Sequence, residues 1–386
     1  MAPTNPIPLV DLKAAHAEVA DEVAAGFERV LATTGFVGGP EVAAFEEEYA
    51  RFCGVRHCVG VANGTDALEL ALRAADVGWG RRNARGEADD EVVLPANTFI
   101  ATAEAVARTG ARPVLVDCEP GSQLIDVQAA LAAVGPRTTA VVPVHLYGQH
   151  AAVEELTAKL AGTTVRVIED AAQCQGATRL GRTAGADGLA ATSFYPGKNL
   201  GAYGDGGAVL TDDADLAATV RALANHGGLS KYSHDLVGFN SRLDALQAVV
   251  LRAKLRRLPE WNATRRTAAE RYGELLAGLE GITLPTTEPG NEHVWHLYVI
   301  RLESFGGDRE RRDALVAKLN AEGIGAGVHY PTALHRTPAF AYLGYEPGAF
   351  PNAEDAASRI VSLPLHPHIT AAQQERVAEA LATALG

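Results

Sequence analysis

A lysine in a glycine-flanked loop is the first residue of this chain that suggests chemistry. Lys198 stands in residues 191–201, between two short apolar runs, and Gly204-Asp-Gly-Gly207 follows it. Loops of this kind carry function on a rigid scaffold. Earlier in the chain, a β-branched run leads into a second candidate, Asp170. A lysine that forms a Schiff base and an acid that pairs with a pyridinium nitrogen are the pair that pyridoxal phosphate (PLP) chemistry requires.

The same cofactor needs donors for its phosphate and a cover for its ring. Gly64 and Thr65 begin a predicted helix after a predicted strand, where backbone N–H groups bind phosphate readily. Ser193 adds a hydroxyl, and Phe99 offers an aromatic face. In this interpretation the acid keeps the ring nitrogen protonated, and the lysine also moves the proton at the substrate carbon.

Each of these residues has a structural alternative when it is taken alone. Lys198 could be a surface charge, and Phe99 could belong to the core. Asp170 could cap the helix after its strand, and Thr65 or Asp66 could be the N-cap of theirs. Their joint occurrence, in the expected order and each at a strand end, favours the cofactor site.

Short apolar runs alternate with amphipathic helical stretches over the first half of the chain. This pattern predicts an α/β fold, in which helices cover a mainly parallel sheet on both faces. The predicted strands cover residues 58–61, 91–94, 112–117, 139–144 and 165–169. A polar segment follows three of these strands, at 63–66, 97–99 and 170–173. Since ligands bind at the carboxyl ends of such strands, we expect these segments at one edge of the sheet.

The chain is long enough for a second, smaller domain. Apolar residues at helical spacing predict a helix over 12–31 and a long helical run that ends near residue 279. Pro259 lies inside that run and should break or kink it. We therefore predict a large PLP-binding domain over residues 1–258 and a small C-terminal domain over residues 259–386.

The small domain has an α+β pattern. An alternating apolar stretch predicts a strand over 294–302, and helical spacing predicts helices over 352–360 and 371–385. In the large domain, the charged stretch 79–90 is typical of a surface loop, and no function is assigned to it.

Composition excludes several other classes of protein. Of the 386 residues, 47% are hydrophobic and 21% charged, as in an ordinary globular protein. The formal net charge of −13 argues against nucleic-acid binding, which requires basic surface. Four cysteines in so long a chain do not suggest a disulfide framework. No apolar run has membrane-spanning length and the first residues lack a signal-peptide pattern, so we expect no membrane association and a cytoplasmic location.

Two other motifs suggest different chemistry at first sight. The glycines of residues 201–207 resemble a dinucleotide-binding signature, but an apolar strand follows them where that motif requires a helix. The pairs His293/His296 and His366/His368 have no carboxylate or cysteine partners at metal-ligand spacing, so we predict no metal site.

Several motifs together resemble the DegT/StrS family of sugar aminotransferases, which are fold-type-I PLP enzymes similar to aspartate aminotransferase. They are Asn63-Gly-Thr-Asp-Ala67, Glu169-Asp-Ala-Ala-Gln173, Ser193-Phe-Tyr-Pro-Gly-Lys-Asn-Leu200, Gly204-Asp-Gly-Gly207 and Asn240-Ser-Arg242. The match runs from about residue 9 to the C-terminus. The resemblance implies that Lys198 forms the Schiff base, that Asp170 pairs with the ring nitrogen and that Gln173 contacts the ring hydroxyl side.

The resemblance also implies how the rest of the cofactor is held. Gly64, Thr65 and Ser193 would bind the phosphate, and Phe99 occupies the position of the family's stacking aromatic residue. Asn240 matches a residue that family members donate to the phosphate of the neighbouring subunit. We therefore expect a homodimer whose active site is shared across the interface.

The substrate is suggested by two further features. Family members that act as dehydratases carry histidine in place of Lys198, so lysine indicates transamination. Residues 328–340 resemble the subgroup that acts at C3 of nucleotide-linked 3-keto sugars, which would put His329 and Tyr330 near the substrate. By themselves these two residues could equally form a packed turn before Pro331.

We therefore expect a PLP-dependent aminotransferase that moves an amino group from L-glutamate to a nucleotide-diphosphate ketosugar, at C3 of a dTDP-linked keto-deoxyhexose. A UDP-linked 3-keto-N-acetylhexuronate or a C4-ketosugar is the alternative substrate. The alternative from another class is a non-catalytic PLP-binding regulator. Regulators of that type usually carry DNA-binding helices and basic surface, which this sequence lacks.

Overall fold

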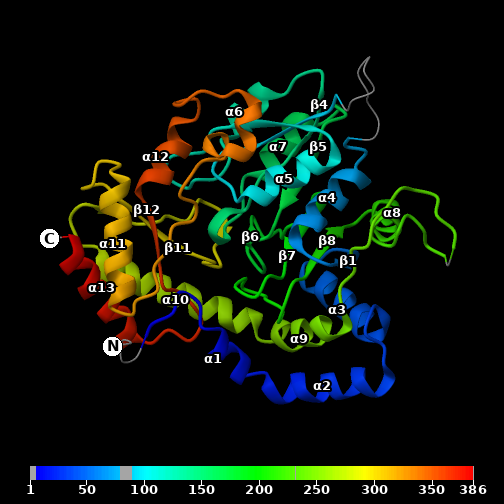
Figure 1. The fold of residues 1–386 in the computed structure, drawn as a ribbon, viewed down its shortest axis with the longest axis horizontal. Coiled ribbons are helices and arrows are strands. Elements are labelled where there is room, and N and C mark those ends of the chain that lie inside the picture. Colours follow the sequence, from blue (N-terminus) through cyan, green and yellow to red (C-terminus); the bar gives the residue numbers. More distant parts are fainter. Residues whose placement is uncertain (1–5, 79–88, 231, 386) are drawn as a thin grey trace.

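A seven-stranded sheet runs through the centre of the molecule (Figure 1). The computed structural model describes residues 6–78, 89–230 and 232–385. The strand order is β1-β8-β7-β5-β4-β2-β3. The strands are β1 (His57–Val61), β2 (Glu91–Pro95), β3 (Arg112–Val116), β4 (Thr138–Val141), β5 (Arg166–Asp170), β7 (Leu189–Ser193) and β8 (Gly207–Thr211). The pairs from β3 through β2, β4 and β5 to β7 are parallel, whereas β8 is antiparallel to β7 and β1. The predicted mainly parallel α/β fold is therefore confirmed.

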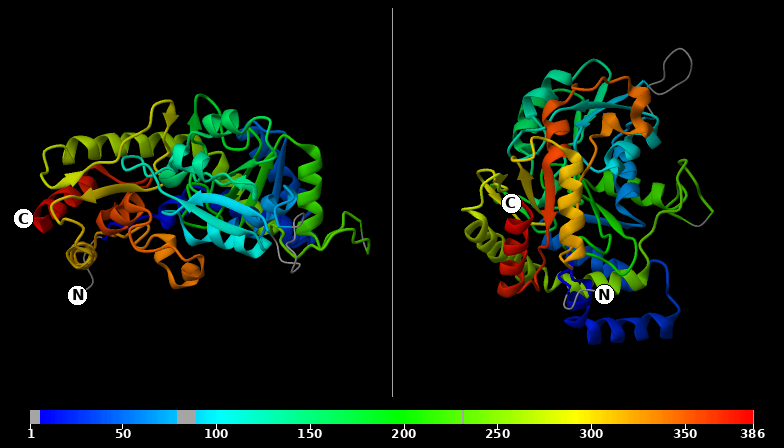
Figure 2. Two further views of the ribbon diagram at one scale, coloured as in Figure 1. Left: turned by 90° about the horizontal axis from the view of Figure 1, so that it is seen from above. Right: turned by 60° about the vertical axis from the view of Figure 1, so that its left-hand side comes forward.

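Helices cover both faces of this sheet, which explains why strands such as β2 are apolar on both sides (Figure 2). Val92 and Leu94 of β2 face a core shared with the first group of helices, and Val93 between them faces the opposite core. The first group consists of α4 (Gly64–Ala74), α5 (Ile100–Thr109) and α8 (Ala214–Ala224). The second group consists of α3 (Gly39–Phe52), α9 (Ala245–Leu255), α6 (Val127–Ala133) and α7 (Val153–Leu160).

A separate core lies in the C-terminal part of the chain, away from the two faces of the large sheet. It is built from the sheet β12-β11-β9 and three helices, and Ile7 joins it by pairing with Ile324. These elements are β9 (Ile282–Thr283), β11 (Tyr298–Leu302), β12 (Ile360–Leu363), α10 (Leu258–Leu276), α11 (Arg309–Ala321) and α13 (Ala371–Leu385). The long helical run is broken before α10, with Pro259 in the first turn of that helix, as predicted. We propose that this core is the small domain of residues 259–386 and that residues 1–258 form the large one.

Several predicted elements were wrong in their extent. The strand predicted over 139–144 is β4, which ends at Val141. The helix over 12–31 is two helices, α1 (Leu12–Ala17) and α2 (Ala20–Thr33), because the fully buried Val19 packs at the turn between them. The helix predicted over 352–360 is α12 (Pro351–Arg359), and Ile360 instead opens strand β12. Strand β11 begins at Tyr298 and not at residue 294, since the preceding N–H groups bond to the turn at residues 147–148.

The remaining elements are short. Strands β6 (Thr178–Arg179) and β10 (Asn291–Glu292) pair with each other, and 3-10 turns occupy Leu146–Gly148, Leu334–Arg336 and Pro338–Leu343. Most of the charged stretch 79–90 lies outside the described residues, at 79–88. Among the described residues, no helix combines the length and the apolar character needed to cross a membrane.

Candidate active site

One edge of the large sheet collects the candidate residues. Val61 of β1 pairs with Gly207 of β8, which in turn pairs with Ser193 of β7. Asp170 pairs with Ala191, one strand further along. Strand β2 is parallel to β4, and β4 is parallel to β5. The segments after β1, β2 and β5, at 63–66, 97–99 and 170–173, therefore lie at one edge, as expected.

The loop that carries Lys198 is held by backbone and side-chain bonds. The Lys198 N–H donates to the carbonyl of Tyr195 (2.8 Å), and the side chain of Asn199 donates to Val294 O (2.9 Å) and to Asn262 Oδ1 (3.0 Å). A Cβ on Gly201 would lie 2.3 Å from the oxygen of Pro196, so the loop closes tightly on itself. Within the described part of the chain, the Lys198 amine has no hydrogen-bond or ion-pair partner. The loop is thus fixed while the amine stays available.

Asp170 is buried at the end of β5, with 5% of its surface exposed. The Thr102 hydroxyl on α5 donates to its Oδ2 (2.7 Å), and the Ala172 N–H donates to its Oδ1 (3.1 Å). Each carboxylate oxygen accepts one protein donor and keeps a lone pair for another group. Such an acid is oriented and has room for one cationic N–H.

The charges of Lys198 and Asp170 influence each other. Burial lowers the pKa of the Lys198 amine to about 8, and the charge of Asp170 opposes that change. Burial raises the pKa of the Asp170 carboxyl, against the hydroxyl of Thr102, the N–H of Ala172 and the charge of Lys198. The two groups are therefore close enough to interact, and a lowered amine pKa makes the neutral, nucleophilic form of Lys198 accessible near neutral pH.

The start of α4 lies against Ser193. The N-cap is Asn63, whose side chain accepts from the Asp66 N–H (2.8 Å), so neither Thr65 nor Asp66 caps this helix. A Cβ on Gly64 would come within 2.5 Å of Ser193 Cβ and 3.0 Å of its Oγ. Glycine is therefore required for the close approach of the two segments. That approach places backbone N–H groups and hydroxyls together, as an anion such as phosphate requires.

Two aromatic residues from distant parts of the chain, Phe99 and Tyr330, pack against each other. Phe99, which precedes α5, is 50% exposed, and its ring centroid lies 5.3 Å from that of Tyr330. The buried Gln173 donates from Nε2 to the Tyr330 hydroxyl (3.0 Å). Segment 329–330 of the C-terminal part thus contacts the large sheet at the same edge as Asp170 and Gln173.

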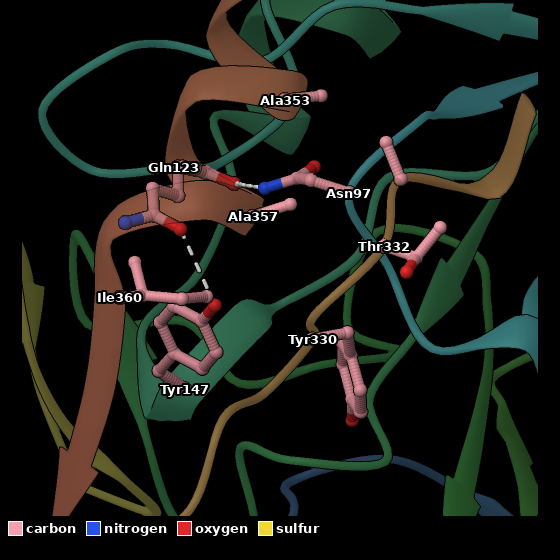
Figure 3. A pocket seen from close by; sticks show the side chains of 10 residues that line it. Asn97, Gln123, Tyr147, Tyr330, Thr332, Ala353, Ala357 and Ile360 are labelled. Carbon is pink, nitrogen blue, oxygen red and sulfur yellow. Dashed lines mark hydrogen bonds between the residues drawn. The ribbon is translucent and has the colours of Figure 1, made fainter. Parts of the chain in front are cut away.

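Tyr147 joins these groups, and sequence reasoning missed it. Its N–H donates to Gln173 Oε1 (2.8 Å), and its hydroxyl donates to the carbonyl oxygen of His329. The hydroxyl also lies 3.2 Å from Gln123 Oε1, beside a small cavity that Asn97 and Tyr330 line as well (Figure 3). Because tyrosine in a short turn carries no local signal, only the folded structure reveals this link.

Asn240 is a predicted cofactor residue that does not join these contacts among the described residues. It is exposed on the segment between α8 and α9, where its backbone pairs with that of Asn225. Among the described residues, its side chain makes no hydrogen bond to the groups around Lys198. The next residue, Ser241, accepts from the Ala62 N–H (3.2 Å) and so ties this segment to the start of α4.

A second buried polar cluster lies behind Asp170. Successive strand residues face opposite sides, so Glu169 points away from Asp170 and accepts from Nε2 of His145 (2.7 Å). His145, His150 and Cys174 lie near enough to one another to suggest a metal site. Both ring nitrogens of His145 are already hydrogen-bonded, however, since Nδ1 accepts a backbone N–H. The His145–Glu169 pair therefore supports the strand that carries Asp170.

Comparisons with known proteins give a consistent picture. Residues 18–382 match the DegT/DnrJ/EryC1/StrS aminotransferase family. The chain is 46% identical over 365 residues to the erythromycin biosynthesis sensory transduction protein EryC1 of Saccharopolyspora erythraea, covering 94% of this chain and 95% of that protein. It is 44% identical over 381 residues to a dTDP-3-amino-3,4,6-trideoxy-alpha-D-glucose transaminase of Streptomyces venezuelae, covering 98% and 96%. The crystal structure of S. venezuelae DesV in complex with a ketimine intermediate is similar with a TM-score of 0.90, at 44% identity and 98% coverage of both chains.

Proposed function

The chain belongs to the DegT/DnrJ/EryC1/StrS aminotransferase family, and from this premise we propose that it transfers an amino group from L-glutamate to C3 of a dTDP-linked keto-deoxyhexose, with PLP as cofactor. The observation that carries the proposal is the convergence of Lys198 and Asp170 on one edge of the sheet, since Asp170 pairs with Ala191 of β7, the strand that precedes the Lys198 loop. A Schiff-base lysine and an acid for a ring nitrogen are what PLP chemistry demands of a protein.

The residues at this edge fit PLP. When bound, PLP supplies an aromatic ring that accepts electrons from the substrate carbon. Lys198 would link to its aldehyde, and Asp170, with a free lone pair on each oxygen, would hold the proton on its ring nitrogen. The close approach of Gly64 to Ser193 leaves a cradle that a Cβ would fill, which suits the phosphate.

Three further residues complete the proposed cofactor site. Thr65, in the first turn of α4, would add its hydroxyl to the phosphate donors, since the N-cap role belongs to Asn63. The exposed ring of Phe99 would lie on the face of the cofactor, and Gln173 would contact its hydroxyl side through the side-chain amide.

Lys198 would act a second time as the proton carrier. When it is not linked to the cofactor, Lys198 Nζ would take a proton from the substrate carbon and return one. A pKa lowered to about 8 suits this task, because both forms of the amine are then populated near neutral pH.

His329 and Tyr330 would face the sugar. Both lie on the segment that Tyr147 and Gln173 attach to the large sheet, beside Phe99. The S. venezuelae relative is named for a dTDP-linked 3-amino sugar, which supports the same substrate class for this chain. The alternatives are a UDP-linked 3-keto-N-acetylhexuronate and a C4-ketosugar. A panel of nucleotide ketosugars with L-glutamate, and NMR location of the new amine at C3 or C4, separates these substrates.

A homodimer would complete the site through Asn240. The segment that carries Asn240 also exposes apolar side chains: Leu229, Leu236 and Val237 are 67%, 42% and 79% exposed. Apolar residues gathered on one projecting segment are typical of a surface that another chain covers. We propose that this segment contacts a second copy and supplies Asn240 to the partner's phosphate cradle.

The test is substitution of the lysine. Lys198→Ala protein should lose the visible absorbance of the bound cofactor and its turnover with glutamate and ketosugar. Turnover at the normal rate in Lys198→Ala protein would refute the proposal. Wild-type protein that binds PLP but aminates no sugar of the panel would favour the regulator.

A further inference from the structure

Two buried threonines stand behind Asp170, and neither has a role in the proposed function so far. Thr102, on the first turn of α5, donates to Asp170 Oδ2 at 2.7 Å and is 1% exposed. Thr98, in the loop after β2, lies 2.9 Å from Thr102 through the two hydroxyl oxygens and is 3% exposed.

The direction of these hydrogen bonds follows from the chemistry of the groups. A hydroxyl has one proton, and Thr102 gives its proton to the carboxylate, so Thr98 must be the donor to Thr102 Oγ1. The chain therefore runs from Thr98 through Thr102 to Asp170. In a buried chain of this kind, each bond polarises the next and strengthens it.

We propose that Thr98 and Thr102 are positioning residues, a hydroxyl chain that orients the Asp170 carboxylate and keeps it ionised opposite the ring nitrogen of PLP. The inference rests on the proposed function, since it assumes that Asp170 faces this nitrogen. A carboxylate that has lost a donor is more basic, because a hydrogen bond to the charged form favours that form. Without Thr102, the shared proton would move from the ring nitrogen toward Asp170, and the ring would draw electrons less strongly.

The chain offers matched variants for the test. Thr102→Val keeps the shape and removes the hydroxyl, and Thr102→Ser keeps the hydroxyl. Thr98→Val removes the outer donor. Thr109→Val is the control, because Thr109 is a buried threonine at the other end of the same helix whose hydroxyl donates to Val106 O (2.7 Å) and not to Asp170.

Each variant is loaded with PLP that carries ¹⁵N in its ring, and the ring nitrogen is observed by NMR. We expect a protonated ring nitrogen in wild-type, Thr102→Ser and Thr109→Val proteins. In Thr102→Val the signal should move toward the neutral form, and the half-reaction with glutamate should slow by about 10- to 100-fold, as for one lost hydrogen bond to a charged group. Thr98→Val should move the signal the same way by less.

The outcomes separate the two claims. A wild-type protein that takes up no labelled PLP would overturn the proposed function. A wild type with a protonated ring nitrogen and a Thr102→Val protein with the same signal and rate would overturn the threonine chain alone. An equal loss in Thr109→Val would also overturn it, since the effect would then follow from any lost hydroxyl on α5. If Thr102→Val does not fold, Thr98→Val is compared with Thr109→Val. The same ¹⁵N signal and rate in these two variants would overturn the threonine chain.

Discussion

Substitution of Gly64 by alanine tests how the phosphate cradle is built. The new Cβ would lie 2.5 Å from Ser193 Cβ, whereas ordinary contacts begin at 3.4 Å, so α4 and β7 must separate by about 1 Å. The atoms in the way are the Cβ, Oγ and Cα of Ser193, which belong to a sheet strand and cannot swing aside. Overpacking of this kind costs about 1–3 kcal/mol.

That cost should appear in the affinity for PLP. The separation moves the Ser193 hydroxyl away from the N–H groups of α4, and both are proposed to bind the same phosphate. In the cofactor-free protein the two segments can separate and relieve the strain, whereas bound PLP requires them to be close. The full cost of about 1–3 kcal/mol then opposes binding, which should weaken by about 5- to 150-fold. The assay is titration of cofactor-free protein with PLP, followed by absorbance, with thermal unfolding of the same samples.

Gly273→Ala is the control for this substitution. Gly273 lies within α10 and has no atom within 4 Å of a new Cβ. Alanine there should stabilise the helix by about 0.5–1 kcal/mol and leave the PLP affinity unchanged. A folded Gly64→Ala protein with wild-type affinity for PLP would show that the close approach of α4 to Ser193 does not shape the phosphate site.

Three further predictions concern other parts of the site. Tyr147→Phe should raise the KM for the ketosugar about fivefold and spare the half-reaction with glutamate, since the His329 carbonyl loses one hydrogen bond. The rate at which cofactor-free protein captures PLP, measured by stopped-flow absorbance, should rise with pH and level off above about 8, as Lys198 loses its proton. Asn240→Ala should lower activity, and mixing it with Lys198→Ala protein should restore part of it, because each mixed dimer has one site with an intact lysine and a partner with an intact asparagine.

Each of these predictions can fail clearly. If Tyr147→Phe slowed the half-reactions with glutamate and with the ketosugar equally, Tyr147 would not act through the segment proposed to bind the sugar. A capture rate that keeps rising up to pH 10 would show that burial does not lower the pKa of Lys198. Mixed Asn240→Ala and Lys198→Ala subunits without activity, in samples shown to exchange subunits, would exclude a shared site.

The sequence predicted the strand at 91–94 because its side chains at 92–94 are apolar for a physical reason. Residues 92–94 lie between two layers of helices, so all three side chains are buried and the run reads as a strand. The edge that gathers the candidate residues follows from strand direction alone. The strand at Ile360–Leu363 was missed because no turn residue separates it from α12. Its first residue, Ile360, also fits the helical spacing, so the helix was predicted one residue too far.

Residues that support the site by hydrogen-bonding to its other members, such as Thr102 and Tyr147, could not be predicted from local sequence patterns. Thr102 stands in helix α5, where a threonine has no special meaning, and its contact with Asp170 joins segments far apart in the chain. Tyr147 bonds to Gln173 on one side and to His329 on the other, which requires the C-terminal segment to be in place. Local patterns therefore found candidates for contact with the cofactor, while their supporting partners required the tertiary structure.

The site at which PLP is linked to the protein shows whether Lys198 holds the cofactor. PLP-loaded protein is reduced with borohydride, which fixes the cofactor on the lysine that holds it, and the labelled peptide is identified by mass spectrometry. We predict a single labelled residue, Lys198, and the loss of that label in Lys198→Ala protein. A label on another lysine, or equal labelling of several, would show that Lys198 is not the residue that holds PLP.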